Sequence, residues 1–237
     1  MSAACRKFLL SVIAALIVGG CSSGTLNWPS SYHIVARGDT LYSISWQYGM
    51  DYRVLARWND LGDGTLIREG QVISLVPPDN EEMRRRSAGS SSGSASSGSS
   101  APPLKVYTPP PEQKVSRWQW PTTGTVVAGY GRSVKTESGI RIGGEYGQSV
   151  SASSGGTVVY AGSALKGYGN LLIVKHNDTY LSAYGFNSEL LVSEGQSVQR
   201  GQQIARMGTT TSGDTVLHFE IRKNGQPVDP GKYLPSR

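Results

Sequence analysis

The sequence predicts a mainly β protein: a small α+β module, a flexible linker and a larger all-β domain. Three observations lead to this prediction. A strand, two short helices and a strand fit into residues 32–76. A Ser/Gly/Pro-rich stretch follows them. From Trp118 onwards, short β-branched runs alternate with glycine turns at spacings typical of a β-sandwich or barrel.

The composition excludes several classes of protein. The chain has 237 residues and a net charge of +6, with 38% hydrophobic and 17% charged residues, so it is not a disordered polyelectrolyte. Its one long apolar run, residues 8–18, falls short of the ~20 residues that cross a bilayer. A multi-span membrane protein is therefore excluded. The basic excess is too mild to indicate nucleic-acid binding.

The first residues predict an export signal. Arg6 and Lys7 precede the apolar run, which ends in Val18-Gly19-Gly20-Cys21. This ending resembles the lipobox of bacterial lipoproteins, which implies cleavage after residue 20 and a lipid on Cys21. An ordinary signal peptide with an incidental cysteine is the alternative. Ser22, rather than Asp, follows Cys21, and the resemblance then implies the inner leaflet of the outer membrane, facing the periplasm. Residues 1–20 are the expected signal peptide and 21–30 a lipidated tether.

The α+β module is expected over residues 31–77. Residues 32–35 alternate as a strand does. Asp39 or Thr40 can cap a helix in which Leu41, Ile44 and Tyr48 share a face, and Asp51 can cap a second helix. Residues 71–76 form the closing strand, which Pro77 and Pro78 end.

These residues resemble a LysM module, in the stretches YHIVARGDTLYSISWQYGM, VLARWNDL and IREGQVISLVP. The resemblance implies binding of N-acetylglucosamine-containing glycans, that is, peptidoglycan. The implied site lies in the loop after the first strand and the loop before the second, at Gly38, Asp39, Thr40, Leu41, Asn59, Leu61 and Ile67. Short polar groups there would recognise the acetamido group and apolar side chains its methyl. Asp39 and Thr40 can equally serve as caps, and Leu41 and Ile67 as core; both roles can hold at once.

The linker is predicted over residues 78–116, where SAGSSSGSASSGSSAPP is low in complexity. The domain after it, residues 117–237, is expected to be an all-β sandwich. Eight strands are predicted, near residues 125–127, 148–150, 156–160, 170–174, 180–184, 197–198, 203–205 and 217–221.

This last domain resembles the LytM (M23 zinc peptidase) family, through WPTTGTVVAGYG, SGIRIGG, GTVVYAGSALKGYGNLLIVKH, EGQSVQRGQQIARMG and LHFEIRKNGQPVDPGKYL. Active members hold zinc through a His and an Asp four residues apart and the second His of an HxH pair. Two further histidines assist. In this sequence those five positions hold Glu137, Arg141, Phe186, Val216 and His218, so His218 alone remains.

The substitutions argue against zinc chemistry. An arginine stays charged and offers no lone pair to a metal. Phe186 and Val216 remove the groups that would transfer protons or stabilise an oxyanion. We therefore expect no catalytic residue, no metal and no cofactor, with His218 hydrogen-bonded inside the domain. Arg141 is free to pair with a partner carboxylate, and Phe186 and Val216 to take an apolar side chain. Simple loss after catalysis became unnecessary is the alternative for each position.

A lipid-anchored LysM–LytM chain with a degenerate LytM site resembles the NlpD and EnvC type of division factor. The resemblance implies a non-catalytic activator of periplasmic N-acetylmuramyl-L-alanine amidases at division sites, whose groove receives a segment of the amidase. A passive peptidoglycan-binding tether to the outer membrane is the second reading, and a working M23 endopeptidase the third. The residues do not separate the first two readings.

Overall fold

The computed structural model describes residues 31–62, 66–78, 113–115, 117–132 and 138–236. Residues Ser31–Arg237 form one compact unit. The predicted signal, the Cys21 anchor, most of the linker and Glu137 lie outside the described residues. Among the helices that are described, none is long and apolar enough to cross a membrane.

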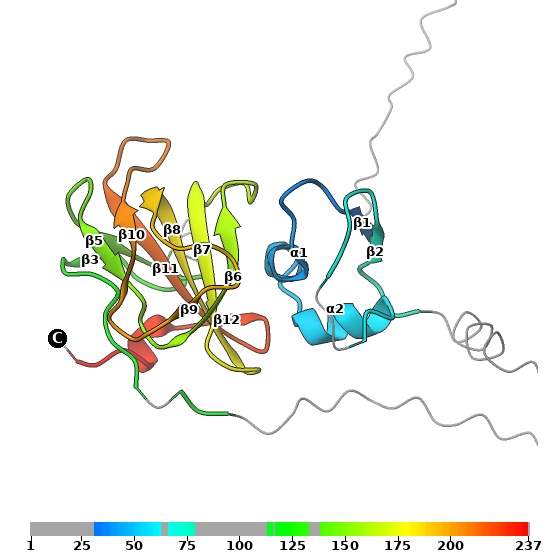
Figure 1. Ribbon diagram of the computed structural model, residues 1–237. Helices are drawn as coiled ribbons and strands as arrows, with labels where there is room; N and C mark the ends of the chain where they lie inside the picture. The colour runs from blue at the N-terminus through cyan, green and yellow to red at the C-terminus, as the bar shows by residue number, and fades with distance from the viewer. Residues whose placement is uncertain (1–30, 63–65, 79–112, 116, 133–137, 237) are drawn as a thin grey trace, which may run out of the picture. The chain divides into compact units, whose positions relative to one another are not determined.

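The N-terminal module has the order β1 (Tyr32–Ile34), α1 (Leu41–Gln47), α2 (Tyr52–Trp58) and β2 (Val72–Ser74), visible in Figure 1. The two strands pair antiparallel, with His33 opposite Ile73. Thr40 caps α1 in a reciprocal capping box with Ser43, and Asp51 caps α2. The predicted elements and the cap at Asp51 are thus confirmed, and Thr40 is the cap of α1. The core of this module is made of Val35, Leu41, Ile44, Leu55, Ala56 and Ile73.

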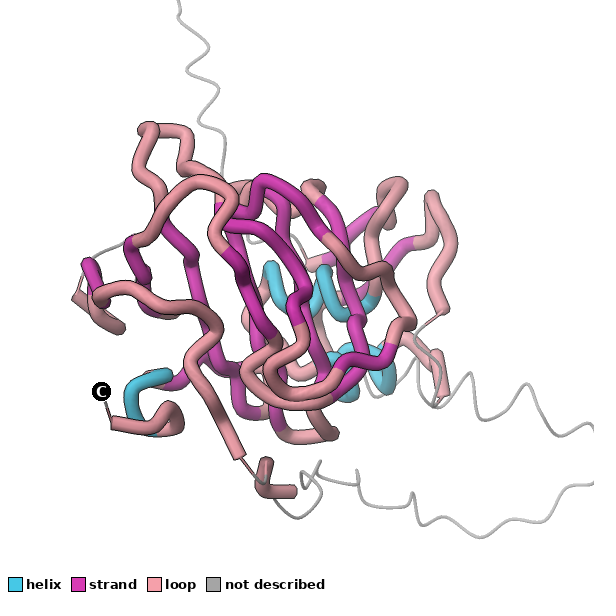
Figure 2. Tube along the Cα trace, turned by 60° about the vertical axis from the view of Figure 1, so that its left-hand side comes forward, coloured by secondary structure: helices cyan, strands magenta, loops and turns pink. Residues whose placement is uncertain are grey.

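Within the described residues, the C-terminal domain contains ten strands that pair antiparallel. Figure 2 draws strands in magenta. They are β3 (Val126–Ala128), β4 (Ile140–Gly143), β5 (Ser149–Ser151), β6 (Gly156–Gly162), β7 (Asn170–Lys175), β8 (Tyr180–Leu190), β9 (Ser197–Val198), β10 (Gln203–Met207), β11 (Val216–Lys223) and β12 (Gln226–Val228). A short 3-10 helix, Pro230–Lys232, follows. The main path runs β3-β4-β11-β8-β7-β6-β9, and β10 branches from β8 to pair with β5. This arrangement confirms the mainly β prediction.

Strand alternation gives the main sheet two different faces. Leu217, Phe219 and Ile221 of β11 point into the domain core, where they meet alternate residues of β4, β7, β8 and β10. The intervening residues of β11 point to the opposite face, because successive side chains of a strand alternate. We call this opposite side the outer face of the sheet. It carries His218, Glu220 and Arg222, all of them buried.

Two strands were absent from the sequence prediction. β4 was missed because its four residues, IRIG, lie between glycines and carry a central arginine. β12 was missed although Asn224 and Gly225, both at positive φ, form the tight turn between β11 and β12. Asn-Gly is the strongest short hairpin signal, and it was available in the sequence.

Candidate functional site

The two loops of the predicted glycan site are joined by backbone hydrogen bonds. Val35 donates to Gln71 O at 2.8 Å, and Gly70 donates to Val35 O at 2.8 Å. Gly38 has φ +85°, a conformation that glycine adopts without strain. Asp39 Oδ2 accepts from Ala36 N at 2.9 Å and from His33 Nε2 at 2.8 Å. The Asp39 carboxylate is therefore already engaged in shaping the loop.

Several predicted glycan residues have structural roles. The Leu41 side chain is fully buried in the module core, which leaves only its backbone near the loop surface. Asn59 clamps α2 to β2: its Nδ2 donates to Leu55 O and Ser74 O, and its Oδ1 accepts from Ser74 N at 2.6 Å. Leu61 and Ile67 pack only partly against the core.

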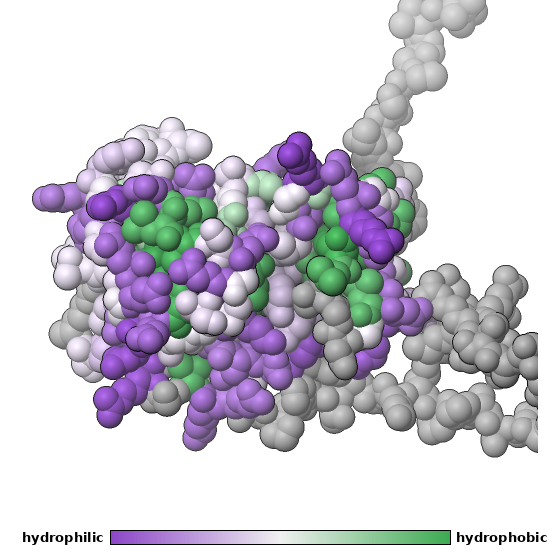
Figure 3. Space-filling model, viewed as in Figure 1, coloured by the Kyte–Doolittle hydropathy of each residue, from purple (hydrophilic) through white to green (hydrophobic). Residues whose placement is uncertain are grey.

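One exposed residue of this region was not predicted. Leu66 leaves 92% of its surface exposed, next to Ile67. Figure 3 shows apolar patches among mostly hydrophilic residues on the face it draws. An exposed apolar side chain in this loop, which is predicted to bind glycan, suits the methyl of an acetamido group. The missed signal was Thr65-Leu66-Ile67, a pair of apolar residues in an otherwise polar turn.

The predicted groove residues of the β domain meet across three neighbouring strands. Arg141 of β4 is the register partner of His218 of β11, and His218 is also the register partner of Gly185 of β8. Phe186 follows Gly185, and its ring lies 6.2 Å from the His218 ring. The Tyr168 ring approaches His218 from another side, at 5.5 Å. We call Arg141, Tyr168, Phe186 and His218 the groove cluster.

Phe186 has an unusual backbone. Its φ is +61°, a left-handed conformation that bulky residues rarely adopt and that costs about 1 kcal/mol or more. Its N–H donates to Tyr168 O at 2.7 Å, and its carbonyl accepts from Gly208 N at 2.8 Å. These bonds hold the aromatic ring beneath the Arg141 guanidinium, 5.3 Å from the ring centroid. Arg141 Nε has no hydrogen-bond partner among the described residues.

His218 belongs to a buried polar network centred on Glu220. Glu220 Oε1 accepts from His218 Nε2 at 2.8 Å, from Ser138 Oγ at 2.8 Å and from Tyr168 OH at 3.0 Å. Its Oε2 accepts from Arg222 Nε at 3.0 Å. Burial alone would raise the pKa of Glu220, but the His218 hydrogen bond and the Arg222 charge outweigh it. The pKa of Glu220 therefore lies below its ordinary value, and the group is a carboxylate at neutral pH.

This network leaves one nitrogen of His218 unused. Because a carboxylate only accepts, His218 Nε2 carries the proton toward Glu220. Nδ1 then has no hydrogen-bond partner among the described residues, although His218 is only 3% exposed. A buried nitrogen without a partner is rare and calls for an explanation.

The residues around His218 do not fit a catalytic zinc ion. Such zinc needs three protein ligands and an open position. Beside His218 stand a guanidinium and a phenyl ring, and Val216 is a buried aliphatic residue. Within the described ranges, no group of three His, Cys, Asp or Glu residues is placed to hold a metal. What the cluster offers instead is a cation, an aromatic surface and a free imidazole nitrogen.

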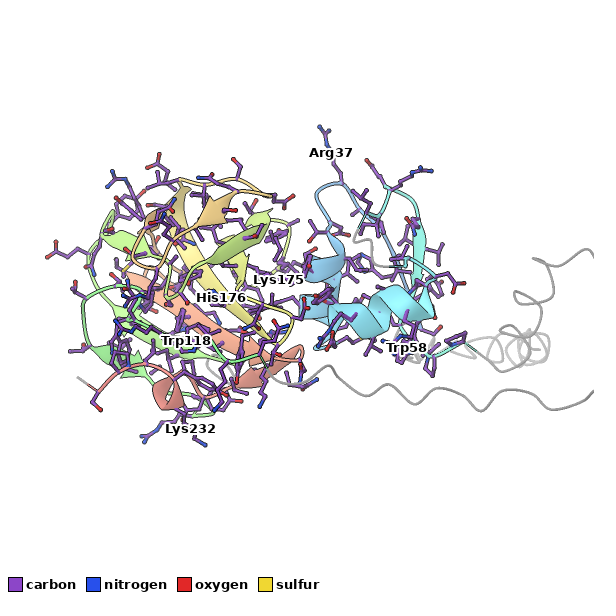
Figure 4. The ribbon with its side chains drawn as sticks, turned by 60° about the horizontal axis from the view of Figure 1, so that its bottom comes forward. Arg37, Trp58, Trp118, Lys175, His176 and Lys232 are labelled. Atoms are coloured by element: carbon purple, nitrogen blue, oxygen red, sulfur yellow. The ribbon has the colours of Figure 1, made fainter. Side chains whose placement is uncertain are left out.

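Two further residues of the β domain, Tyr184 and His176, lie outside the groove cluster. Tyr184 is fully buried in the domain core, consistent with the packing role that its position in a strand suggested. His176, labelled in Figure 4, packs edge-on against Trp118 with ring centroids 4.8 Å apart. Both nitrogens of His176 have partners: Gly155 O and Ser182 Oγ, each at 2.8 Å.

Sequence reasoning missed Glu220 and Arg222 as part of the site. The signal was available in the alternation of β11. Val216 and His218 share a face of this strand, so residues 220 and 222 must share it too. Two opposite charges at alternate positions on that face indicate a buried ion pair that continues the site along the sheet.

Comparison with known families supports both modules. Residues 33–76 match the LysM domain and residues 135–230 match Peptidase family M23. The chain is 48% identical over 235 residues to a "Lipoprotein NlpD/LppB homolog" of Pseudomonas aeruginosa, covering 88% of this chain and 78% of that protein. It is 40% identical over 232 residues to an uncharacterized lipoprotein, YgeR, of Escherichia coli, covering 96% and 91%.

A third relative matches about half of this chain at higher identity. It is the "Murein hydrolase activator NlpD" of Escherichia coli, 54% identical over 123 residues, which cover 52% of this chain and 32% of that protein. The chain thus spans about a third of the length of that activator. With both modules matched, and a relative 48% identical across most of its length, the chain belongs to the NlpD/LppB family of lipoproteins.

Proposed function

We propose that this protein is a non-catalytic activator of periplasmic N-acetylmuramyl-L-alanine amidases, bound to peptidoglycan through its LysM module. The observation that supports the proposal is the groove cluster, in which Arg141 is the register partner of His218 and lies over the Phe186 ring. The resemblance to M23 peptidases implies a zinc ligand at position 141 and a proton-transfer group at position 186, and neither residue can serve in that way. The relative named a murein hydrolase activator supports the same reading.

The cluster has the chemistry of a binding surface. Arg141 lies over Phe186 with Nε unpartnered among the described residues, and His218 Nδ1 is likewise unpaired there. A partner carboxylate would accept from the Arg141 guanidinium, and an N–H or O–H donor on the partner would pair with His218 Nδ1. An aromatic or aliphatic side chain of the partner would pack on Phe186. Binding of this kind, if stronger for the open form of an autoinhibited amidase, shifts the amidase population toward that form.

The location follows from the N-terminus and from the relatives. We infer lipidation at Cys21 and anchoring in the inner leaflet of the outer membrane, supported by relatives that are named lipoproteins. The anchor, the LysM module at 31–77 and the β domain at 117–237 then place the groove within reach of the cell wall. Action at division sites during septal splitting belongs to the same proposal.

Dye release from labelled sacculi tests the proposal, using residues 22–237 alone with zinc, and then mixed with a periplasmic amidase that is weak by itself. We expect release only in the mixture. Phe186→Asp and Arg141→Glu should reduce that release by about tenfold or more while sacculus pelleting stays intact. Arg206→Glu, an exposed charge reversal on β10, is the matched control and should act as wild type.

Two outcomes would contradict the proposal. Release by the protein alone, abolished by a chelator, would identify a working zinc peptidase. No release with any periplasmic amidase, with sacculus pelleting intact, would identify a passive tether between the outer membrane and the wall.

A further inference from the structure

Helix α1 of the LysM module is apolar on more than one side. Leu41 and Ile44 fill the core of the module itself. Tyr42 and Trp46, at positions i and i+4, belong to a different cluster and are also buried, with Trp46 only 3% exposed. A helix that is buried all round needs cover on both sides, and one small module supplies only one of them. The second cover is the β domain.

The outer face of the main sheet provides that cover. Alternate residues of β7 and β8 that do not enter the domain core join Tyr42 and Trp46 in one cluster. These residues are Leu171, Ile173, Leu181 and Ala183, and Tyr160 and Leu165 complete the set. All six are buried. Without α1, this sheet would present a contiguous apolar patch of the kind that soluble domains rarely leave open.

Polar contacts surround the shared cluster. The Thr40 hydroxyl donates to Val159 O at 3.3 Å, and Tyr52 OH donates to Asp178 Oδ1 at 3.2 Å. Lys175, labelled in Figure 4, pairs with Asp178 and also lies over the Tyr52 ring. At Gly225, an added Cβ would meet Met50 O at 2.3 Å, so the backbones of the two modules approach too closely for a side chain.

Arg222 connects this contact to the groove. Its guanidinium carbon lies 3.6 Å from the centroid of the Trp46 ring, and its Nη1 donates to Trp46 O at 2.7 Å. Its Nε donates to Glu220 Oε2. One flat guanidinium therefore stacks on α1, bonds to α1 and bonds to Glu220 at the same time. A lysine ammonium has three donors, but they sit on one nitrogen, so it has neither the flat plane nor the spaced fork of donors for this arrangement.

The connection continues to the groove cluster along one strand. Arg222, Glu220 and His218 occupy alternate positions on the outer face of β11. Glu220 holds His218 through Oε1 and Arg222 through Oε2. If α1 left the sheet, Arg222 would lose its stacking partner and its carbonyl acceptor and would turn toward water. Glu220 would then lose the cation that balances its charge, and His218 would lose its fixed orientation.

We propose that the LysM module is a structural part of the partner-binding groove, with Trp46 and Arg222 acting as positioning residues for His218. The module then has a second role besides holding peptidoglycan: its docking on the sheet keeps the groove in its binding-competent form. The expected effect on amidase stimulation rests on the proposed function, whereas the docking of α1 on the sheet does not.

Hydrogen exchange on residues 22–237 tests the docking directly. In Trp46→Ala and Arg222→Lys, amides of β11 and of residues 42–46 should exchange about tenfold faster or more. Trp58→Ala, which removes an aromatic ring of α2 outside both clusters, and Arg206→Lys are the matched controls and should leave β11 unchanged (Figure 4). Trp46→Phe keeps a ring and the backbone carbonyl, and should restore slow exchange.

Amidase stimulation tests the consequence. Trp46→Ala and Arg222→Lys should each lower stimulation by about fivefold or more, with unchanged sacculus pelleting. The double variant should lose no more than either single variant, because both changes break the same connection. Trp46→Phe should recover most of the stimulation.

Three outcomes would overturn the inference. The first is β11 exchange in Trp46→Ala equal to that in Trp58→Ala, which would mean that α1 does not dock. The second is faster exchange with full stimulation, which would mean that docking does not position the groove. The third is additive losses in the double variant. If wild-type protein stimulates no amidase, the proposed function fails, and the exchange measurement alone decides the docking.

Discussion

The β domain contains two histidines with opposite hydrogen-bonding environments. His176 has a partner on each ring nitrogen: one hydrogen bond to a backbone carbonyl and one to the Ser182 hydroxyl. The Ser182 hydroxyl is also hydrogen-bonded to Tyr184 OH, and Tyr184 OH accepts from Ser153 N. His218 has one hydrogen-bond partner, Glu220, and its other nitrogen has none among the described residues.

The difference in hydrogen bonding distinguishes a histidine with a structural role from a histidine that is available for binding. A fully satisfied buried network fixes a conformation and has no capacity left for a ligand. The His218 network leaves Nδ1 of His218 unpaired, and Nε of the neighbouring Arg141 is also unpaired among the described residues. These two nitrogens remain able to hydrogen-bond to a partner. By this criterion His176 stabilises the domain, and His218 belongs to the surface that we propose for the amidase.

The largest expected effect is on stability, at the carboxylate that supports His218. Glu220→Leu should lower the free energy of unfolding by about 3–5 kcal/mol, because it leaves the Arg222 charge buried and unpaired. Urea unfolding measures this loss. Glu189→Leu breaks the exposed pair with Arg206 and should cost about 1 kcal/mol or less. Equal losses of unfolding free energy in the two variants would contradict the idea that the buried Glu220 network stabilises the domain.

The next effect concerns pH at His176. Burial lowers the pKa of His176 from 6.5 to about 4, against the weaker opposing effect of the Gly155 hydrogen bond. Between these values the unfolded chain binds a proton and the folded one does not. Stability is therefore complete above pH 6.5 and falls as the pH drops toward 4. Between pH 7 and pH 5 we expect a loss of about 2 kcal/mol.

Urea unfolding at a series of pH values measures this slope, and His176→Gln should flatten it. A slope that survives in His176→Gln would assign the pH dependence to another group. The carboxylate of Glu220 does not interfere above pH 5, because its pKa lies below the ordinary value.

The smallest effect on stability is expected at His218, the histidine with one unpaired nitrogen. His218→Ala should cost about 1 kcal/mol, since Glu220 keeps its bonds from Ser138, Tyr168 and Arg222. Amidase stimulation should nevertheless fall about tenfold. His176→Ala should do the reverse, with a larger loss in urea unfolding and stimulation near wild type at a temperature where both are folded. Matching profiles for the two variants would erase the distinction between them.

Local patterns predicted most of the fold. Asp51 and Thr40 capped their helices, and the period-2 runs of β6, β7, β8 and β11 were found in place. Three members of the groove cluster, Arg141, Phe186 and His218, were named through the resemblance, and strand register and ring contacts bring them together. Tyr168 was not among the predicted groove residues. These features depend on neighbours in the sequence or on the pairing of two strands, and sequence patterns can predict both.

What the sequence prediction missed depends on contacts between distant segments. No role was predicted for Trp46, although Leu41 and Ile44 fill one face of the helix and leave Tyr42 and Trp46 to another. The residues that cover this second face belong to the other module, so no pattern within the helix identifies them. The left-handed backbone of Phe186 has no local signal at all, because the bonds to Tyr168 and Gly208 impose it.

The alternation of β11 also bears on how the chain avoids misfolding. A slip of one residue in its pairing with β8 would drive a glutamate, an arginine and a histidine into the core and expel Leu217, Phe219 and Ile221. Few strands make an incorrect register so costly. The residues that we assign to partner binding and docking therefore also act as a proofreading element during folding, which gives selection a second reason to keep them.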